Sequence, residues 1–111
     1  MKAMLGETLL ARADQEDLIK IEGNWYFPPA SVRFENLIES TTPYTCPWKG
    51  VCQYFTVRIG ERELPDRAWS YLEPYPTAIE RVGKDFTGYV AFWKDVKVVE
   101  EEGSADRLAS A

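Results

Sequence analysis

Glycine and proline residues divide this chain into short segments, and no other feature limits its fold as strongly. Seven glycines and seven prolines are spread over 111 residues. Many of the segments between them are rich in β-branched and aromatic residues, which favour strands, and at most one or two have the spacing of a short helix. We therefore predict a small single domain of the all-β class, with about seven to nine short antiparallel strands.

Each predicted strand is bounded by turn-forming residues. The first two form a hairpin across Gly6 and Glu7, and residues 89–93 are apolar on both faces, which is typical of a central, covered strand. The expected strands are residues 2–5, 8–11, 18–22, 25–27, 36–40, 51–59, 68–72, 89–93 and 96–99. The clearest period-two alternation lies in residues 51–59. Its apolar face carries Val51, Phe55, Val57 and Ile59, and the opposite face carries Cys52, Tyr54, Thr56 and Arg58.

The connections between these strands are assigned from their composition. Residues 41–50 read as a long irregular loop, and residues 60–66 as a charged turn that contains a proline. Residues 77–82 are expected to form a short helix, with Thr77 as N-cap and Glu80 at the capping-box position.

The chain is expected to form one domain over residues 1–100. Residues 101–111 begin with two glutamates and a glycine, and we expect an acidic, flexible C-terminal tail there.

The charge balance argues against several functions. The chain has 13 basic and 18 acidic residues, a net charge of −5 and no histidine. An acidic chain without a basic stripe is a poor nucleic-acid binder, and no apolar run is long enough to cross a membrane. The start of the chain lacks the pattern of a signal peptide, so we expect a cytoplasmic protein. No P-loop or dinucleotide-binding glycine motif occurs, and we predict no cofactor.

Cys46 and Cys52 are the two cysteines, too few for a four-cysteine zinc site, and no metal site is predicted. Cys46 lies in an unusual run that continues as Pro47, Trp48, Lys49 and Gly50. A nearby ammonium stabilises a thiolate, which is the nucleophilic form of cysteine. Cys46 is therefore either a reactive or ligand-contacting thiol or a buried structural residue, and the second reading is the commoner one for a free cysteine.

Aromatic residues make up 14% of the chain, and they dominate small cores. Trp69 and Tyr71 alternate along one strand and therefore share a face. Trp69 is expected to be part of the core. Tyr71 is expected at the rim of a pocket, because its hydroxyl needs a hydrogen-bond partner.

Five blocks of sequence together resemble the family known as domain of unknown function 427 (DUF427). They are Trp25-Tyr26-Phe27-Pro28, Thr45-Cys46-Pro47-Trp48-Lys49-Gly50, Tyr54-Phe55-Thr56-Val57, Ala68-Trp69-Ser70-Tyr71 with Pro74, and Gly88-Tyr89-Val90-Ala91-Phe92. The resemblance spans about residues 1–100 and implies a β-tent-like fold, similar to that of methionine-R-sulfoxide reductases, in which two splayed sheets leave a cleft. The paired zinc cysteines and the late catalytic cysteine of such relatives have no counterpart here, so neither the metal nor the activity carries over.

The leading hypothesis is a domain that binds a small molecule in an aromatic cleft, with Lys49 binding an anionic group. The expected lining consists of Tyr26, Cys46, Trp48, Lys49, Tyr54, Trp69 and Tyr71. Two alternatives stay open. One is an enzyme that uses Cys46 as nucleophile or redox centre with Lys49. The other is an interaction module that forms a homodimer through an aromatic sheet face.

Overall fold

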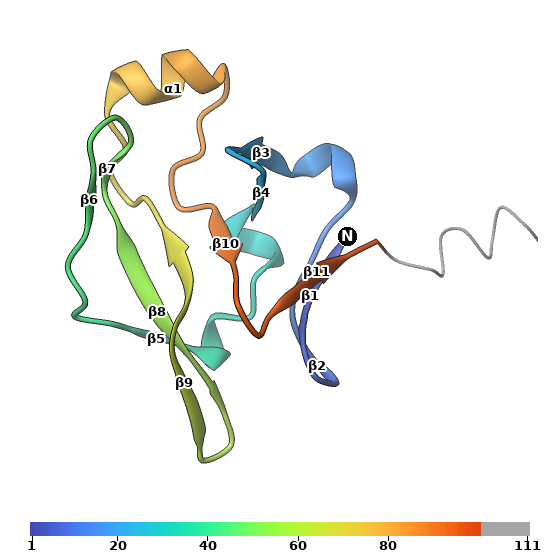
Figure 1. Ribbon diagram of the computed structural model, residues 1–111. Helices are drawn as coiled ribbons and strands as arrows, with labels where there is room; N and C mark the ends of the chain where they lie inside the picture. Colours follow the sequence, from blue (N-terminus) through green and yellow to red (C-terminus); the bar gives the residue numbers. More distant parts are fainter. Residues whose placement is uncertain (101–111) are drawn as a thin grey trace, which may run out of the picture.

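The structure is a computed structural model that describes residues 1–100. Within that range the chain forms eleven strands and one α-helix, together with three single-turn 3-10 helices (Figure 1). In chain order these elements are β1 (Lys2–Leu5), β2 (Thr8–Arg12), β3 (Ile19–Ile21), β4 (Asn24–Phe27), β5 (Leu37–Glu39), β6 (Thr45–Cys46), β7 (Gly50–Val51), β8 (Gln53–Ile59), β9 (Arg62–Ser70), α1 (Pro76–Val82), β10 (Val90–Phe92) and β11 (Lys97–Val99). The predicted all-β class is confirmed, with two more strands than the upper expectation. The tail expected over residues 101–111 lies outside the described residues.

Three antiparallel sheets organise these strands. The largest has the order β3-β4-β10-β9-β8-β5, the second has the order β11-β1-β2, and β6 pairs only with β7 (Figure 1). Strand β10 lies between β4 and β9, and all three of its residues are buried. The prediction of a central, covered strand at residues 89–93 is therefore confirmed.

A first core is shared by the six-stranded and three-stranded sheets. It is almost entirely aliphatic and phenylalanine. Its buried members are Ala3, Leu5, Leu10, Ala11, Leu18, Phe27, Val32, Phe55, Val57, Leu64, Ala68, Val90, Phe92 and Val96. Because side chains alternate along a strand, one face of β4, β9 and β10 enters this core, through Phe27, Ala68, Val90 and Phe92.

The neighbouring residues Tyr26, Trp69 and Ala91 of the same strands enter a second core on the opposite face of the six-stranded sheet. This core contains tyrosine, tryptophan and both cysteines. Its buried members are Ile19, Ile21, Tyr26, Cys46, Cys52, Trp69, Tyr71, Ala78, Phe86 and Ala91. The helix α1 contributes Ala78, and the β6–β7 hairpin contributes Cys46, so these two elements cover this face.

The turn predicted over residues 60–66 is present only at Gly60 and Glu61, and its predicted extent is wrong, because β9 already begins at Arg62. Leu64 pairs with Val57 and Ala68 with Phe55, so three residues of β9 face a single residue of β8. Such a bulge accommodates Pro65, which has no N–H for the ladder. Asp66 adopts a left-handed backbone with φ of +56° at this point. A charged, proline-containing stretch can therefore continue a strand.

Three further expectations were wrong in detail. Residues 41–50 contain β6 and most of the β6–β7 hairpin rather than only irregular loop. The alternation of residues 51–59 breaks at Cys52, between β7 and β8, and this leaves Val51 63% exposed instead of in the core. The helix begins at Pro76 with Tyr75 as N-cap, so Thr77 lies inside its first turn. Proline favours the first helical position because its φ is already helical and its missing N–H needs no partner there.

Candidate functional site

The second core does not fill its face of the sheet. A hollow of about 320 Å³ remains, which we call the aromatic hollow. It is lined by Tyr44, Lys49, Cys52, Tyr54, Trp69, Tyr71 and Trp93. Tyr54 and Trp69 project from the paired strands β8 and β9, Trp93 follows β10 directly, and the remaining residues lie in or beside the β6–β7 hairpin and at the end of β9.

Aromatic rings form the sides of this hollow. The rings of Trp93 and Tyr54 are stacked, with centroids 6.3 Å apart and an interplanar angle of 17°. Trp69 meets Trp93 edge to face at 5.3 Å, and Tyr44 lies tilted against Tyr54 at 6.5 Å. Each of these rings is thus held in place by another ring.

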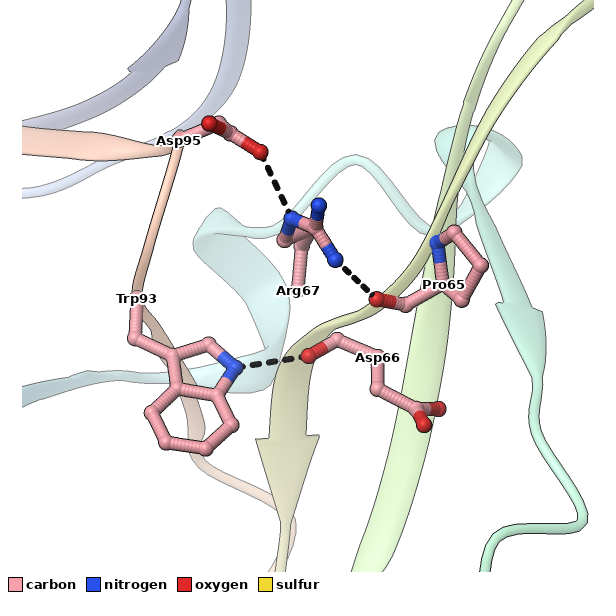
Figure 2. A network of polar contacts seen from close by, with 5 residues as sticks. All are labelled: Pro65, Asp66, Arg67, Trp93 and Asp95. Atoms are coloured by element: carbon pink, nitrogen blue, oxygen red, sulfur yellow. Dashed lines mark hydrogen bonds and ion pairs between the residues drawn. The ribbon is translucent and has the colours of Figure 1, made fainter.

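The bulge in β9 fixes the position of Trp93 (Figure 2). The indole Nε1–H of Trp93 donates a hydrogen bond of 2.6 Å to the backbone oxygen of Asp66. Arg67 Nε donates to Asp95 Oδ2 at 2.8 Å, and the Arg67 guanidinium also donates to the backbone oxygen of Pro65. The hydrogen bond from Arg67 lowers the pKa of Asp95. The bulge therefore ties the loop after β10 to the edge of the hollow.

Tyr26 lies behind Trp69 and away from the hollow. Its side chain is completely buried, and its hydroxyl accepts a 2.9 Å hydrogen bond from Trp69 Nε1. The two rings also meet edge to face at 6.1 Å. Tyr26 positions Trp69 and is not itself among the residues that line the hollow.

Lys49 places one positive charge at the hollow. Only 8% of its side chain is exposed, and its Nζ forms a close ion pair with Glu22, whose side chain is 54% exposed. Burial acts to lower the pKa of Lys49, but the hydrogen bond with Glu22 and the electrostatic influence of Tyr26, Glu22 and Cys46 outweigh burial, and the pKa is raised from its ordinary 10.5. Nζ also lies 5.2 Å from the ring centroids of Trp48 and Tyr71. Lys49 is therefore ionised at neutral pH.

The other titratable groups deep in the hollow are neutral. Burial raises the pKa of the Cys52 thiol to about 11, although a hydrogen bond with Tyr71 and the charge of Lys49 act in the opposite direction. Burial also raises the pKa of Tyr71 far above its ordinary value. Both groups keep their protons at neutral pH, so they offer neutral hydrogen-bonding groups beside the single ammonium.

Cys46 and Trp48 lie beside the hollow and do not line it. Cys46 is 5% exposed and packs in the second core. Trp48 is half-buried, and the guanidinium of Arg81 lies 4.5 Å from its ring centroid. Of the seven residues predicted for the cleft, the structure brings Lys49, Tyr54, Trp69 and Tyr71 together around the hollow and places Tyr26, Cys46 and Trp48 behind or next to it.

Sequence reasoning missed four residues of this site. The backbone N–H of Cys52 donates a 2.9 Å hydrogen bond to the backbone oxygen of Tyr44. This contact follows from the β6–β7 hairpin, which the sequence did not predict. Trp93 lies two residues after Ala91 and so on the same face, a spacing that could have identified it. Nothing in the sequence near Glu22 indicates its pairing with Lys49.

Two further observations concern the described residues only. Within residues 1–100, no three His, Cys, Asp or Glu side chains are grouped closely enough to hold a metal ion. The single α-helix of that range is far shorter than a membrane span.

Fold and site together define a small antiparallel β domain with a lysine-bearing aromatic hollow on one face of its main sheet. A family model described as a domain of unknown function, DUF427, matches residues 2–103, and the chain belongs to this family. A search of the curated proteins found no match. The family description names no ligand or reaction, so function has to be argued from the hollow itself.

Proposed function

We propose that this protein binds a small, flat organic molecule in the aromatic hollow. The observation that carries the proposal is the convergence of five aromatic side chains and one buried ammonium on a single hollow. The rings would stack on the ligand, and Lys49 would donate a hydrogen bond to an acceptor group on it.

The dimensions and surface of the hollow support binding. Its volume of about 320 Å³ is near the lower end of the range for small-molecule sites. Two of its rings are well exposed, Trp93 at 38% and Tyr44 at 47%. A ligand that covers them removes apolar surface from water, which contributes roughly 25 cal/mol for each Å² buried.

Lys49 supports a polar or anionic group on the ligand. A buried ammonium is costly unless its protons are hydrogen-bonded. Nζ carries three protons, and Glu22 accepts one hydrogen bond from it. A carbonyl or carboxylate oxygen in the hollow would accept another, so the ligand would be oriented by one strong contact.

The environment of Cys46 favours binding over thiol chemistry. Its side chain is 5% exposed, and the ammonium that would activate it is already paired with Glu22. We expect slow alkylation of Cys46 in a Cys52→Ser variant until the chain unfolds. Fast alkylation of the folded variant, with an apparent pKa well below the ordinary value of about 8.5, would favour the enzyme alternative instead.

The binding proposal is tested with a fragment library of flat organic molecules and the affinity of the best fragment for three variants. We expect Trp93→Ala and Tyr54→Ala to weaken binding about tenfold or more, because each removes a stacking surface. Trp25→Ala is the matched control. Trp25 is also partly buried and has a lysine, Lys20, 5.0 Å from its ring centroid, but it lies outside the hollow. Equal affinities for all three variants and the wild type would contradict the proposal.

A further inference from the structure

We propose that Lys49, Trp48 and Arg81 form a carboxylate subsite at the hollow, and that Glu22 occupies it as a displaceable internal counterion. The ligand class is then the flat organic carboxylates, whose own carboxylate replaces that of Glu22 on Lys49. This inference rests on the proposed function, because it names the chemical class of ligand for the same hollow.

The groups around the Glu22 carboxylate are those that would bind any carboxylate. Lys49 Nζ forms the ion pair, and Trp48 and Arg81 also favour the charged form of Glu22, by a hydrogen bond and by charge respectively. The Arg81 guanidinium and Lys49 Nζ lie over the same Trp48 ring, at 4.5 Å and 5.2 Å from its centroid. Lys49 therefore contacts the carboxylate directly, while Trp48 and Arg81 lie close by and favour its charged form.

Burial is unequal across this ion pair. The Lys49 side chain is 8% exposed, whereas the Glu22 side chain is 54% exposed. The cation is thus a fixed part of the interior, and its partner reaches it from the surface. A half-exposed carboxylate keeps much of its hydration and attracts the ammonium weakly, whereas a carboxylate shielded by aromatic rings would attract it more strongly.

The local backbone allows Glu22 to leave. Glu22 lies in the turn between β3 and β4 with φ of +53°, and Gly23 follows with φ of +84°. The strand pairing ends at Ile21 and Asn24, on either side of this turn. Rotation of the Glu22 side chain into water therefore breaks no strand hydrogen bond. A positive φ at both central residues is what two-residue hairpin turns favour, so this backbone conformation does not depend on the contact between Glu22 and Lys49.

The charge of the hollow selects the ligand class. Lys49 is the only residue that carries a formal charge at neutral pH among the side chains that line the hollow. A neutral ligand leaves the Glu22–Lys49 pair intact. A ligand carboxylate on Lys49 would lie beside the carboxylate of Glu22, and the repulsion between the two anions drives Glu22 into water. Glu22 consequently competes with carboxylate ligands and does not compete with neutral ones.

The test compares benzoate with benzamide, which share a flat ring and differ in charge. Dissociation constants are measured by NMR titration of the full chain at pH 7, in the wild type and in Glu22→Gln. We expect Glu22→Gln to bind benzoate about tenfold more tightly and benzamide with less than a twofold change, because only benzoate competes with Glu22. Glu63→Gln is the matched control. It removes the same charge from an exposed position on β9, and we expect neither affinity to change by more than about twofold.

Each outcome is informative. Selective tightening of benzoate in Glu22→Gln supports the counterion exchange. Equal changes for benzoate and benzamide, or a tightening of benzoate in Glu63→Gln as large as that in Glu22→Gln, would overturn the exchange and leave the hollow as a binding site. Binding of neither probe to the hollow in either variant would overturn both the carboxylate class and the proposed function.

Discussion

The two faces of the six-stranded sheet differ in chemistry although the same strands build both. On β10, Val90 and Phe92 enter the first core and Ala91 enters the second. On β4, Phe27 enters the first core and Tyr26 the second. The first face is covered by a second sheet, and the other is covered by α1, by the segment after it that carries Phe86, and by the hairpin of the two-residue strands β6 and β7. The difference between the faces therefore comes from what covers them as well as from the side chains.

This contrast separates a tightly packed core from the candidate site within one sheet. The first core contains only aliphatic and phenylalanine side chains, which stabilise through burial and packing. The second adds Trp69, Tyr71 and two thiols and leaves a hollow with a buried ammonium at its edge. Buried polar groups and exposed rings reduce stability unless they are satisfied or covered, so this face is where a ligand would contribute most.

The largest expected effect is the loss of a side chain from the first core. Phe27 is completely buried and packs edge to face on Phe92 at 5.8 Å. We expect Phe27→Ala to lower the free energy of unfolding by about 3–5 kcal/mol, measured by urea denaturation. Trp93→Ala removes a larger side chain, but one that is 38% exposed, and we expect a loss of only about 1–2 kcal/mol. Equal losses in the two variants would contradict the division between the faces.

The second largest expected effect is the loss of the hydrogen bond that holds Trp69. Tyr26→Phe removes the acceptor of Trp69 Nε1–H and leaves a buried donor without its partner. We expect the free energy of unfolding to fall by about 1–3 kcal/mol. Tyr75→Phe is the control, since Tyr75 is exposed, and we expect it to change stability by less than about 0.5 kcal/mol. A Tyr26→Phe variant as stable as this control would show that the hydrogen bond is dispensable.

A smaller effect of opposite sign is expected at Ser70. Ser70 is 1% exposed, and its hydroxyl has no hydrogen-bond partner in the described part of the chain. On β9 it lies two residues from Ala68 and so on the side of the first core. We expect Ser70→Ala to raise the free energy of unfolding by about 1 kcal/mol. Ser31→Ala is the control and should be destabilising, because Ser31 Oγ donates a 2.7 Å hydrogen bond to the backbone oxygen of Pro28. A loss of stability in Ser70→Ala would reveal a partner for the hydroxyl.

The smallest effect is the pH dependence of the Glu22–Lys49 pair. The hydrogen bond from Lys49 lowers the pKa of Glu22 from 4.5. A depressed carboxyl pKa contributes stability that is complete above 4.5 and is lost as the pH falls through the lower, folded-state value. Glu22 is half exposed, so solvent screening limits this contribution to less than about 1 kcal/mol.

Urea denaturation of the wild type and of Glu22→Gln between pH 7 and pH 3 measures the contribution of Glu22 to the free energy of unfolding. We expect the wild type to be the more stable protein at pH 7 and the difference to vanish towards the lowest pH. The contribution of Lys49 to stability has the opposite pH dependence. Its pKa is raised in the folded state, so the stabilisation is complete below pH 10.5 and is lost only above that value. A difference between the two proteins that stays constant from pH 7 to pH 3 would contradict the pairing.

Much of the fold could be predicted because it depends on local patterns. Gly6 between two apolar segments identifies the β1–β2 hairpin, and the doubly apolar residues 89–93 identify the central strand. The bulge at Pro65 could not be predicted, because a proline followed by two charged residues, Asp66 and Arg67, has the same composition in a turn and in a bulge. Which of the two forms depends on pairing with a distant strand.

The candidate site was predicted in part for the same reason. Tyr54 and Trp69 lie on strands whose alternation is visible in the sequence, and they pair directly across β8 and β9. Glu22 reaches Lys49 across 27 positions of sequence, and no local pattern encodes such a contact. The opposing Tyr44 and Cys52 depend on a hairpin of two-residue strands, which is too short to leave a periodic pattern.

One spectrum tests the central claim that the polar, aromatic face of the sheet is the binding face. The chain has four tryptophans, so a ¹H–¹⁵N spectrum contains four indole N–H signals. Trp69 and Trp93 line the hollow, Trp48 lies beside it, and Trp25 packs against the first core. On saturation with a bound fragment we expect the Trp69 and Trp93 signals to shift most and the Trp25 signal to stay in place. A fragment that shifts Trp25 and leaves Trp69 and Trp93 unchanged would contradict the claim.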